Sequence, residues 1–355
     1  MTVLYFGDYD ASYTRTRILL KGLREHGATV VEMNERGGGI SMYLRLWRSF
    51  RAYRGPYDAM VIGYGNARLM PLFARCIGAK RIIWEALFSK YDNFVFDRKL
   101  ASPRSPKAYL YRFLDWLGCA VSDLVLLDTK LHTRYFHETF GVPERKLAFV
   151  YVGADTDIFY PRARAGRPDG FEIEFHGKYF PMQGTDVIIR AASLLEKQGV
   201  HFTLIGNGQE LKRTKALAES LHVSNVTFKQ FLPQEEIVEY VKNADMCIGL
   251  IGDVPRVVRA IPTKLWEAAA MGRVSINASP GSLEEVFTPG KDVIGITPGD
   301  HEGLARTILE LKQSGAADAM GAAARETFLQ YGTPAVVGKA FADLVSARFP
   351  DVTRT

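Results

Sequence analysis

The feature that most constrains the fold of this chain is a regular alternation of short apolar strands with helical segments. In the first half, strands are predicted at residues 2–6, 28–33, 58–63, 80–85 and 123–128, and the helices between them include 15–27, 68–78, 106–121 and 130–140. Strands that alternate with helices favour a parallel sheet with helices on both faces. A ligand of such a sheet binds at the carboxyl ends of the strands. The loops after Phe6, Ile83 and Leu127 are therefore of first interest.

The same alternation starts again after a break near residues 155–168. This stretch contains Pro161, Gly166 and several arginines, a composition typical of a linker. Beyond it, strands are predicted at 171–177, 201–206, 225–231, 245–250, 274–277 and 292–296, with helices that include 185–199, 210–222, 234–244 and 261–271. We therefore predict an α/β protein with two Rossmann-like, doubly wound domains at residues 1–160 and 168–330. A last helix at about 334–350 is expected to pack back on the first domain.

Composition excludes several other classes of protein. Hydrophobic residues make up 47% and charged residues 24%, as in ordinary globular domains. No apolar run has the length of a membrane span, and the first residues do not resemble a secretory signal. The three cysteines, which are far apart, indicate reduced core residues, so we expect a cytoplasmic protein without a disulfide framework.

The positive charge of the chain lies in its first half. Residues 1–160 contain 23 basic and 16 acidic side chains, whereas the formal net charge of the whole chain is +6. Such asymmetry indicates an anionic partner, which on charge alone is a membrane surface, a phosphorylated acceptor or nucleic acid.

Residues 260–276 combine a short predicted helix with a strand and carry two charged side chains of interest. Lys264 and Glu267 are three residues apart, so they project from the same side of the helix. The helix N–H groups and the lysine suit a phosphate, and the carboxylate suits ribose hydroxyls. The alternative is an ordinary ion pair on the surface.

Two glycine-containing turns follow buried strands of the second half. The stretch FHGKYFPMQG (175–184) contains Gly177, Lys178 and Gly184, and TLIGNGQE (203–210) contains Gly206, Asn207 and Gly208. Glycines allow close approach of a ligand to the backbone, and the lysine can neutralise a diphosphate. Each turn alone is also explained as a plain connection between a strand and a helix.

Taken together in this order, the stretches between residues 175 and 276 resemble the donor-binding domain of the GT-B glycosyltransferases, in particular the retaining family 4. The resemblance covers residues 171–311, and VGADTDIFYP (152–161) is similar to the stretch where that family crosses between domains. It implies two domains that face a central cleft. It also implies a nucleotide-sugar donor, UDP- or GDP-linked, with no metal or other cofactor.

The resemblance implies roles for single residues. Glu267 matches the glutamate that holds the ribose hydroxyls, and Lys178 matches the first of two basic residues on the donor diphosphate. Gly177 and the turn Gly206–Asn207–Gly208 match the nucleotide side of the site. Gly7 matches the first-strand loop, whose backbone faces the donor phosphates and sugar.

The chain departs from the family pattern at two positions. Gln183 stands where the second basic residue is usual, and Arg259 stands where many relatives have a second glutamate, eight positions before Glu267. We hypothesise that Arg256, Arg259 and Lys264 replace the missing cation and stabilise the leaving diphosphate. The catalytic candidates are therefore Lys178, Arg259 and Lys264. The alternative for Arg256 and Arg259 is that they are solvated loop charges.

Candidates for acceptor binding or acid–base work lie in the first half, after predicted strands or at the first helix: Arg15, Glu85, Asp92, Asp97 and Asp128. A retaining transfer with front-side attack requires leaving-group stabilisation and a positioned acceptor hydroxyl, but no enzyme nucleophile. Each of these carboxylates therefore also has a purely structural interpretation.

Two DxD strings, at residues 8–10 and 155–157, are typical of the metal site of a different glycosyltransferase fold. Here they lie in the first loop and in the linker, and the seven histidines lack ligand spacing, so we predict no metal. His176 is interpreted as a packed strand residue.

A basic amphipathic helix is predicted at residues 41–55, where aromatic and apolar side chains alternate with four arginines. Such a helix suits peripheral contact with the inner face of an anionic membrane. The pattern is equally typical of a helix that packs on the core and exposes a basic side.

The resemblance implies a retaining hexosyltransferase that moves a sugar from a nucleoside-diphosphate sugar to a glycan, a lipid-linked acceptor or another acceptor, in polysaccharide or glycolipid synthesis, with no nucleic-acid partner. Two alternatives stay open. One is a nucleotide-sugar 2-epimerase of the same fold, and the other is a non-catalytic nucleotide-sugar-binding subunit.

Overall fold

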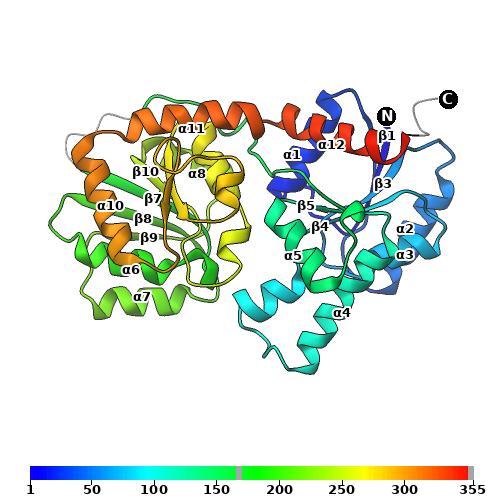
Figure 1. Ribbon diagram of the computed structural model, residues 1–355, viewed down its shortest axis with the longest axis horizontal. Helices are drawn as coiled ribbons and strands as arrows, with labels where there is room; N and C mark the ends of the chain where they lie inside the picture. Colours follow the sequence, from blue (N-terminus) through cyan, green and yellow to red (C-terminus); the bar gives the residue numbers. More distant parts are fainter. Residues whose placement is uncertain (165–169, 351–355) are drawn as a thin grey trace. The chain divides into compact units, whose positions relative to one another are not determined.

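The computed structural model describes residues 1–164 and 170–350 and shows two compact units (Figure 1). Unit 1 comprises Met1–Val95, Lys99–Gly153 and the chain from Thr333, and unit 2 comprises Phe96–Arg98 and Ala154–Gly332. Residues 165–168 of the expected linker, and with them the expected start of the second domain at 168, lie outside the described residues. Three residues from the first half of the chain, 96–98, belong with unit 2, which the sequence pattern did not indicate.

Unit 1 is built on one parallel sheet. Its strands are β1 (Thr2–Gly7), β2 (Thr29–Asn34), β3 (Ala59–Ile62), β4 (Ile82–Leu87), β5 (Leu124–Leu127) and β6 (Leu147–Phe149). Its helices are α1 (Thr14–Glu25), α2 (Gly39–Ala52), α3 (Met70–Cys76), α4 (Pro106–Val121), α5 (Lys130–Phe140) and α12 (Pro334–Arg348), with a π-helical turn at Asp92–Asp97 and a 3-10 turn at Glu144–Lys146. The strand order is β2-β1-β3-β4-β5-β6. β2 therefore lies on one side of β1 and the later strands lie on the other, which places the switch point of the sheet between β1 and β3.

Helices cover both faces of this sheet. Side chains of α1 and α12 pack on one face with Val3, Tyr5 and Val61, and α2, α3, α4 and α5 pack on the other with Leu4, Phe6 and neighbouring strands. Figure 1 shows α1 and α12 on the opposite side of the unit 1 strands from α4 and α5.

The last helix, α12, packs closely on α1 through two glycines. A Cβ added to Gly22 would lie 1.9 Å from the carbonyl oxygen of Pro334, and one added to Gly338 would lie 2.0 Å from the carbonyl carbon of Gly22. Contacts this short exclude any side chain, so the two backbones meet directly and bury Val337 and Phe341.

Unit 2 repeats the architecture. Its strands are β7 (Phe171–Lys178), β8 (Val200–Asn207), β9 (Val226–Lys229), β10 (Met246–Ile248), β11 (Val274–Ala278) and β12 (Ile294–Ile296). Its helices are α6 (Thr185–Leu194), α7 (Leu211–Ser220), α8 (Gln234–Asn243), α9 (Thr263–Ala270), α10 (His301–Ser314) and α11 (Ala317–Tyr331), with 3-10 turns at Pro181–Gln183, Val257–Arg259 and Ser282–Glu285.

The second sheet is also parallel, with the strand order β12-β11-β10-β7-β8-β9. Two doubly wound parallel sheets were predicted from the sequence, and this fold class is confirmed. In unit 2 the strand order reverses between β7 and β10, so the loops after these two strands leave the sheet side by side. Open α/β sheets bind ligands at this kind of position.

No helix in the described residues is long and apolar enough to cross a membrane.

Candidate donor-binding site

The candidate site is formed in unit 2 at the switch point between β7 and β10. The loop after β7 contains Gln183 and Gly184, and the chain after β10 runs through residues 249–262 into α9. A Cβ on Gly252 would lie 2.0 Å from the carbonyl oxygen of Pro181, and the Gly252 N–H donates to the Met182 carbonyl at 3.1 Å. The two loops are therefore in direct backbone contact.

The paired turns that end β7 and β8 require glycine for a structural reason. Gly177 and Gly206 lie opposite each other in the parallel pair, and both have positive φ. A Cβ on Gly206 would lie 1.9 Å from the Gly177 oxygen, and a Cβ on Gly208 would lie 2.5 Å from the Tyr179 nitrogen. Close packing of the two strand ends thus demands Gly206 and Gly208, whatever ligand they face. Asn207, between them, is exposed.

Glu267, on α9, is held by two hydrogen bonds. His176 on β7 contacts one carboxylate oxygen at 2.8 Å, and Gln234 at the start of α8 donates to the other at 3.0 Å. On its opposite side the His176 ring contacts Glu174 at 2.8 Å. The carboxylate of Glu267 is nearly fully buried, and its orientation is fixed by groups from two other elements.

The charge state of His176 follows from its two acidic neighbours. Burial opposes protonation, but Glu174 and Glu267 outweigh it and raise the pKa of His176 to about 9. The ring is therefore an imidazolium at neutral pH, and it donates from both nitrogens.

Lys264 lies in the first turn of α9 beside this network. Its ammonium donates to the Oε1 atom of Gln183 at 2.5 Å and lies 3.8 Å from the centre of the Phe175 ring. A Cβ on Gly177 would lie 3.4 Å from Nζ, so the lysine end sits above the backbone at Gly177. Burial lowers the pKa of Lys264 to about 7, against the opposing effect of Glu174 and Glu267. The surface ion pair considered from sequence is thus wrong: both side chains are buried.

The structure brings together five of the predicted site residues around Lys264 and the β7 turn: Gly177, Gln183, Gly206, Lys264 and Glu267. Lys178 follows directly and is exposed at the end of β7, and Arg259 is half-buried in the 3-10 turn before α9.

Arg256, which we hypothesised to act on the leaving diphosphate, lies in a buried ion pair. It is buried, and one of its terminal nitrogens donates to Asp97 at 3.1 Å and contacts the sulfur of Met182 at 2.9 Å. Asp97 is fully buried and also accepts from the Met182 N–H at 3.0 Å. Both were expected to face a substrate. In the structure, the ion pair joins residues 96–98 to the chain after β10, and the bond from the Met182 N–H joins them to the loop after β7. Each buried charge of the pair thus has a charged partner.

Arg15 and Glu85 also differ from expectation. Both are buried in unit 1, and Arg15 donates to Glu85 at 2.6 Å and to the carbonyl oxygens of Val150 and Tyr151 at 2.8 Å. The Tyr5 hydroxyl donates to the second oxygen of Glu85. This cluster joins α1 to β1, to β4 and to the residues that follow β6, so these buried charges have a structural role in the core of unit 1.

The other unit 1 candidates lie at the carboxyl edge of the sheet. Gly7 ends β1 with φ of +136°. Asp92 is buried, and its N–H donates to Ser89. Asp128 follows β5, and its carboxylate contacts Nδ1 of the buried His132 at 2.5 Å. His132 is thus a structural partner of Asp128, and the sequence analysis did not predict this contact.

The first aspartate of each DxD string accepts backbone hydrogen bonds, Asp8 from the loop after β3 and Asp155 from its own loop. Asp8 accepts from the N–H groups of Asn66 and Ala67, and Asp155 accepts from the N–H of Asp157 at 3.1 Å. Among residues 1–164 and 170–350, no group of three or more His, Cys, Asp or Glu side chains is arranged to hold a metal ion.

Sequence reasoning missed Glu174 and Gln234, and it treated His176 as a packing residue. One signal was present: Glu174 and His176 are two apart in a strand, so they share one face of the sheet. Gln234 carries no such signal, because it reaches Glu267 only through the packing of α8.

Comparisons with known proteins place the chain beside glycosyltransferases in sequence and in fold. Residues 161–327 match the family model described as glycosyl transferases group 1. Among curated proteins, the D-inositol 3-phosphate glycosyltransferase of Acidothermus cellulolyticus is 27% identical over 213 residues, which cover 54% of this chain and 46% of that protein. The corresponding protein of Kribbella flavida is 27% identical over 188 residues, which cover 48% of this chain and 43% of that protein. The match thus spans less than half the length of these relatives.

Solved structures share the fold over nearly the whole chain. Sucrose-phosphate synthase of Thermosynechococcus elongatus superposes with a TM-score of 0.79 at 15% identity, covering 99% of this chain and 100% of that one. HepE of Anabaena, in complex with UDP-glucose, superposes with a TM-score of 0.75 at 13% identity, covering 98% of this chain and 100% of that one.

Proposed function

We propose that this chain, whose residues 161–327 match the glycosyl transferases group 1 family, is a glycosyltransferase. It transfers a sugar from a nucleoside-diphosphate sugar to an acceptor hydroxyl with retention of configuration. The observation that carries the proposal is the fixed carboxylate of Glu267 beside the buried Lys264 at the switch point of unit 2.

Glu267 is the ribose-binding residue in this proposal. Two donors, His176 and Gln234, occupy one lone pair on each oxygen, and a carboxylate has about four such sites. The remaining sites accept from the two ribose hydroxyls. Because the carboxylate is already oriented, little side-chain entropy is lost when the nucleotide binds.

Lys264 and Lys178 act on the diphosphate. In the transfer, the bond between the anomeric carbon and the diphosphate oxygen breaks, and the acceptor oxygen bonds to that carbon on the same face. The leaving diphosphate takes the acceptor proton. Positive charge near the diphosphate stabilises this transition state, and no enzyme nucleophile is required. Arg259 remains a proposed third cation. Gln183 supports the site by accepting a hydrogen bond from Lys264.

The proposed donor is UDP-linked, since HepE, which shares the fold, is in complex with UDP-glucose. GDP-linked sugars are the second choice. We propose that no metal is required, because cationic side chains do the work of a metal on the diphosphate. Activity unchanged by EDTA would agree with this.

The acceptor is proposed to be a glycan, a glycolipid or another hydroxyl compound bound through unit 1, with Gly7, Asp92 and Asp128 as its edge residues. The name of the curated relatives makes D-inositol 3-phosphate one compound to test. The basic helix α2 exposes Ile40, Leu44 and Trp47, and it is our proposed membrane contact if the acceptor is lipid-linked.

The test is to incubate the protein with a panel of UDP-, GDP- and ADP-sugars, with and without acceptor. Turnover is measured as the release of nucleoside diphosphate. We expect turnover of one donor, and we expect Glu267→Ala to lose this turnover. An α-linked donor should give an α-linked product. Formation of the 2-epimer would instead support the epimerase. Binding of a nucleotide-sugar without turnover on any acceptor or water would support the non-catalytic subunit.

A further inference from the structure

A short stretch from the first half of the chain, residues 96–98, belongs to unit 2, whereas its neighbours Val95 and Lys99 belong to unit 1. The first two residues of this stretch end the π-helical turn Asp92–Asp97. Such turns are rare in proteins and occur frequently at functional sites. The place of residues 96–98 is therefore not explained by the packing of unit 1 alone.

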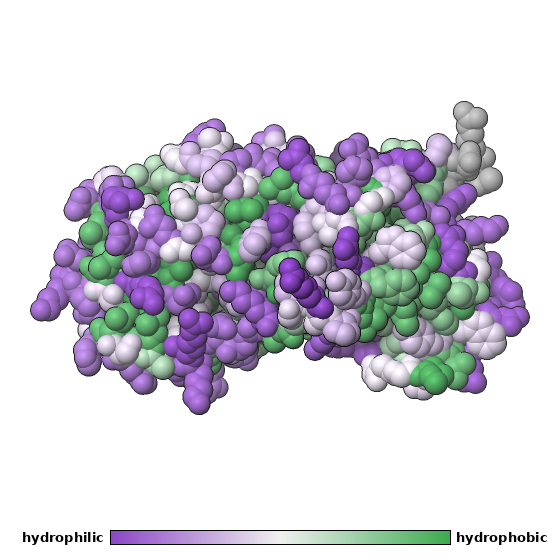
Figure 2. Space-filling model, turned by 60° about the horizontal axis from the view of Figure 1, so that its bottom comes forward, coloured by the Kyte–Doolittle hydropathy of each residue, from purple (hydrophilic) through white to green (hydrophobic). Residues whose placement is uncertain are grey.

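Asp97, in the middle of this stretch, is a buried charge with two partners in unit 2. Its Oδ1 atom accepts from the Met182 N–H at 3.0 Å, and its Oδ2 atom accepts from Nη1 of Arg256 at 3.1 Å. Asp97 is 0% exposed, and Met182 and Arg256 are each 5% exposed. Charged side chains normally lie at the surface, and Figure 2 shows hydrophilic residues spread widely over the face that it presents. The burial of this pair is therefore unusual.

Stability is a weak explanation for a buried ion pair. Removal of both charges from water opposes folding, and apolar side chains of similar volume often give a protein that is equally or more stable. A pair with fixed hydrogen bonds does provide a defined geometry. Asp97 uses one oxygen for a guanidinium and the other for a backbone N–H, so it fixes a direction as well as a distance. The role of the pair then lies in the loops that it joins.

The first of these loops, after β7, carries a residue of the candidate donor site. Met182 directly precedes Gln183, whose Oε1 atom accepts from Nζ of Lys264 at 2.5 Å. The Met182 carbonyl accepts from the Gly252 N–H at 3.1 Å, so both backbone groups of Met182 have fixed partners. A single residue thus connects Asp97 to the group that holds the buried ammonium of Lys264.

Residues 96–98 also contact the loops after β8 and β10. Arg256 lies in the chain after β10, and Arg98 contacts Gln209, which follows β8. The Arg98 guanidinium donates to Oε1 of Gln209 at 3.2 Å and lies 4.3 Å from the centre of the Phe180 ring, and the Arg98 carbonyl accepts from Gln209 at 3.1 Å. Because β10, β7 and β8 are neighbours in the sheet, the three loops leave its carboxyl edge together.

We propose that Asp97 is a positioning residue of the donor site, which holds Gln183 and Lys264 in place before the nucleotide binds. A site whose groups are already ordered loses less conformational freedom on binding and therefore binds more tightly. The inference rests on the proposed function, since it gives Asp97 its role through donor binding. Asp97 acts through the Met182 N–H and does not itself touch the donor.

Two matched double variants of the full chain test the inference. Asp97→Asn with Arg256→Met (the asparagine variant) and Asp97→Leu with Arg256→Met (the leucine variant) both remove the buried ion pair. Asparagine and leucine are similar in size, but only asparagine keeps an acceptor for the Met182 N–H. Calorimetry measures the tightest-binding of UDP, GDP and ADP. The asparagine variant should bind it within about threefold of the parent and the leucine variant about tenfold or more weaker, because small displacements of a site are costly.

Hydrogen exchange without nucleotide measures the order of the loop directly. The N–H groups of residues 182–184 are all hydrogen-bonded. They should exchange about tenfold or more faster in the leucine variant than in the asparagine variant, because loss of one bond favours local opening. Peptides of β1 should exchange equally in both. This experiment needs no ligand, so it separates failure of the inference from failure of the proposed function.

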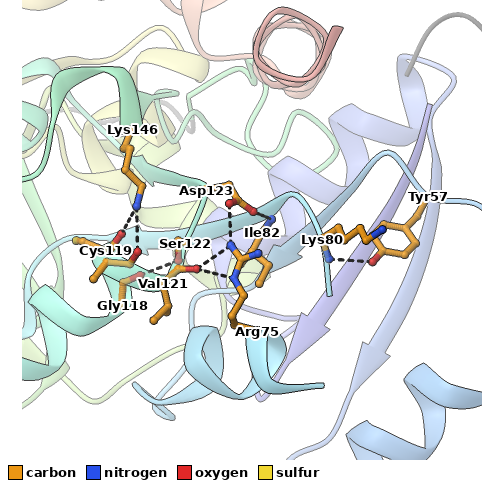
Figure 3. Close-up of polar contacts among 11 residues, drawn as sticks. Tyr57, Arg75, Lys80, Ile82, Gly118, Cys119, Val121, Ser122, Asp123 and Lys146 are labelled. Atoms are coloured by element: carbon orange, nitrogen blue, oxygen red, sulfur yellow. Dashed lines mark hydrogen bonds and ion pairs between the residues drawn. The ribbon is translucent and has the colours of Figure 1, made fainter. Parts of the chain in front are cut away.

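Two controls match Asp97 in chemistry and in burial. Asp123 also pairs with an arginine and accepts a backbone N–H, from Arg75 at 2.7 Å and from Ile82 at 2.8 Å, at the amino-terminal edge of the unit 1 sheet (Figure 3). Asp123 is exposed, so Glu85→Gln, which alters the buried pair with Arg15, is the control for burial. Asp123→Leu with Arg75→Met, and Glu85→Gln, should leave nucleotide affinity and exchange in the loop after β7 unchanged.

Equal nucleotide affinity of the asparagine and leucine variants would overturn the inference, whatever their exchange rates. An affinity that falls as much in Glu85→Gln as in the leucine variant would overturn it too, since the effect would then be a general loss of stability. A parent that binds none of the three nucleotides would refute the proposed function. Exchange would then decide alone, and equal rates at residues 182–184 in the two variants would overturn the positioning role.

Discussion

Lys264 offers a sharp test of the site, because its replacement should stabilise the protein and weaken nucleotide binding together. Methionine has a similar length and no charge, so Lys264→Met removes the buried ammonium with little change in packing. The exposed Lys212 on α7 provides the matched control, Lys212→Met.

The magnitude follows from the pKa. With an ordinary value of 10.5 in the unfolded chain and about 7 in the folded protein, the charge disfavours folding by about 5 kcal/mol at pH 6, about 4 at pH 7 and about 2 at pH 9. The folded protein binds fewer protons than the unfolded chain between pH 7 and 10.5, so this contribution makes parental stability rise with pH across that window. Loss of the hydrogen bond to Gln183 offsets about 1–3 kcal/mol of the gain, independently of pH.

The expected result is therefore a stabilisation by Lys264→Met that decreases by about 3 kcal/mol between pH 6 and pH 9. Urea unfolding at several pH values measures it. In calorimetry, UDP should bind the variant at least tenfold more weakly. A tenfold loss corresponds to about 1.4 kcal/mol, and a hydrogen bond to a charged group contributes about this much or more. Parental binding should take up about half a proton at pH 7, because the diphosphate restores the lysine charge.

The reasoning about Lys264 would be refuted by a variant that is no more stable than the parent at pH 6. A stabilisation that grows with pH would refute it equally. If stability changed as expected but UDP affinity did not, the lysine would be buried for another reason, and the proposed contact with the diphosphate would be wrong.

Three further predictions concern other side chains. Glu267→Gln should keep an acceptor for His176 but weaken UDP binding by about 10- to 100-fold, as expected for a lost hydrogen bond to a charged group; equal affinity in calorimetry would exclude a role in ribose binding. Glu85→Gln leaves Arg15 as a buried charge with a neutral partner, so urea unfolding should show a loss of about 3–5 kcal/mol, while UDP affinity stays parental. His176 has a raised pKa, so its contribution to stability is complete below about pH 6.5 and is lost as pH rises through about 9. The difference in unfolding free energy between the parent and His176→Gln should therefore shrink by about 3 kcal/mol from pH 6 to pH 10. A pH-independent difference would show that the ring is neutral.

Much of the fold was predictable from local patterns. The alternation of strands and helices is a property of neighbouring residues, and it indicated two doubly wound sheets that the strand orders confirm. The order of the glycine turns and of the stretch around Glu267 indicated the glycosyltransferase similarity that residues 161–327 show, and it indicated the part of the chain that we propose to bind the donor. These signals are local because each depends on periodicity or spacing within one or two elements.

Only the tertiary structure decided which charges face a ligand. Arg15 and Glu85 are 70 residues apart, and Arg256 and Asp97 are 159 apart, yet each pair is buried together. In α4, apolar residues occur on every side, so the sequence did not predict which side of the helix packs on the core. In the structure Gly118 packs against Trp84, and the aromatic rings of α4 are exposed. The sequence alone determined where strands and helices form and where the family motifs lie. The pairing of distant charges and the exposed side of α4 depended on strand order and helix packing, because burial is a property of the assembled core and not of any single segment.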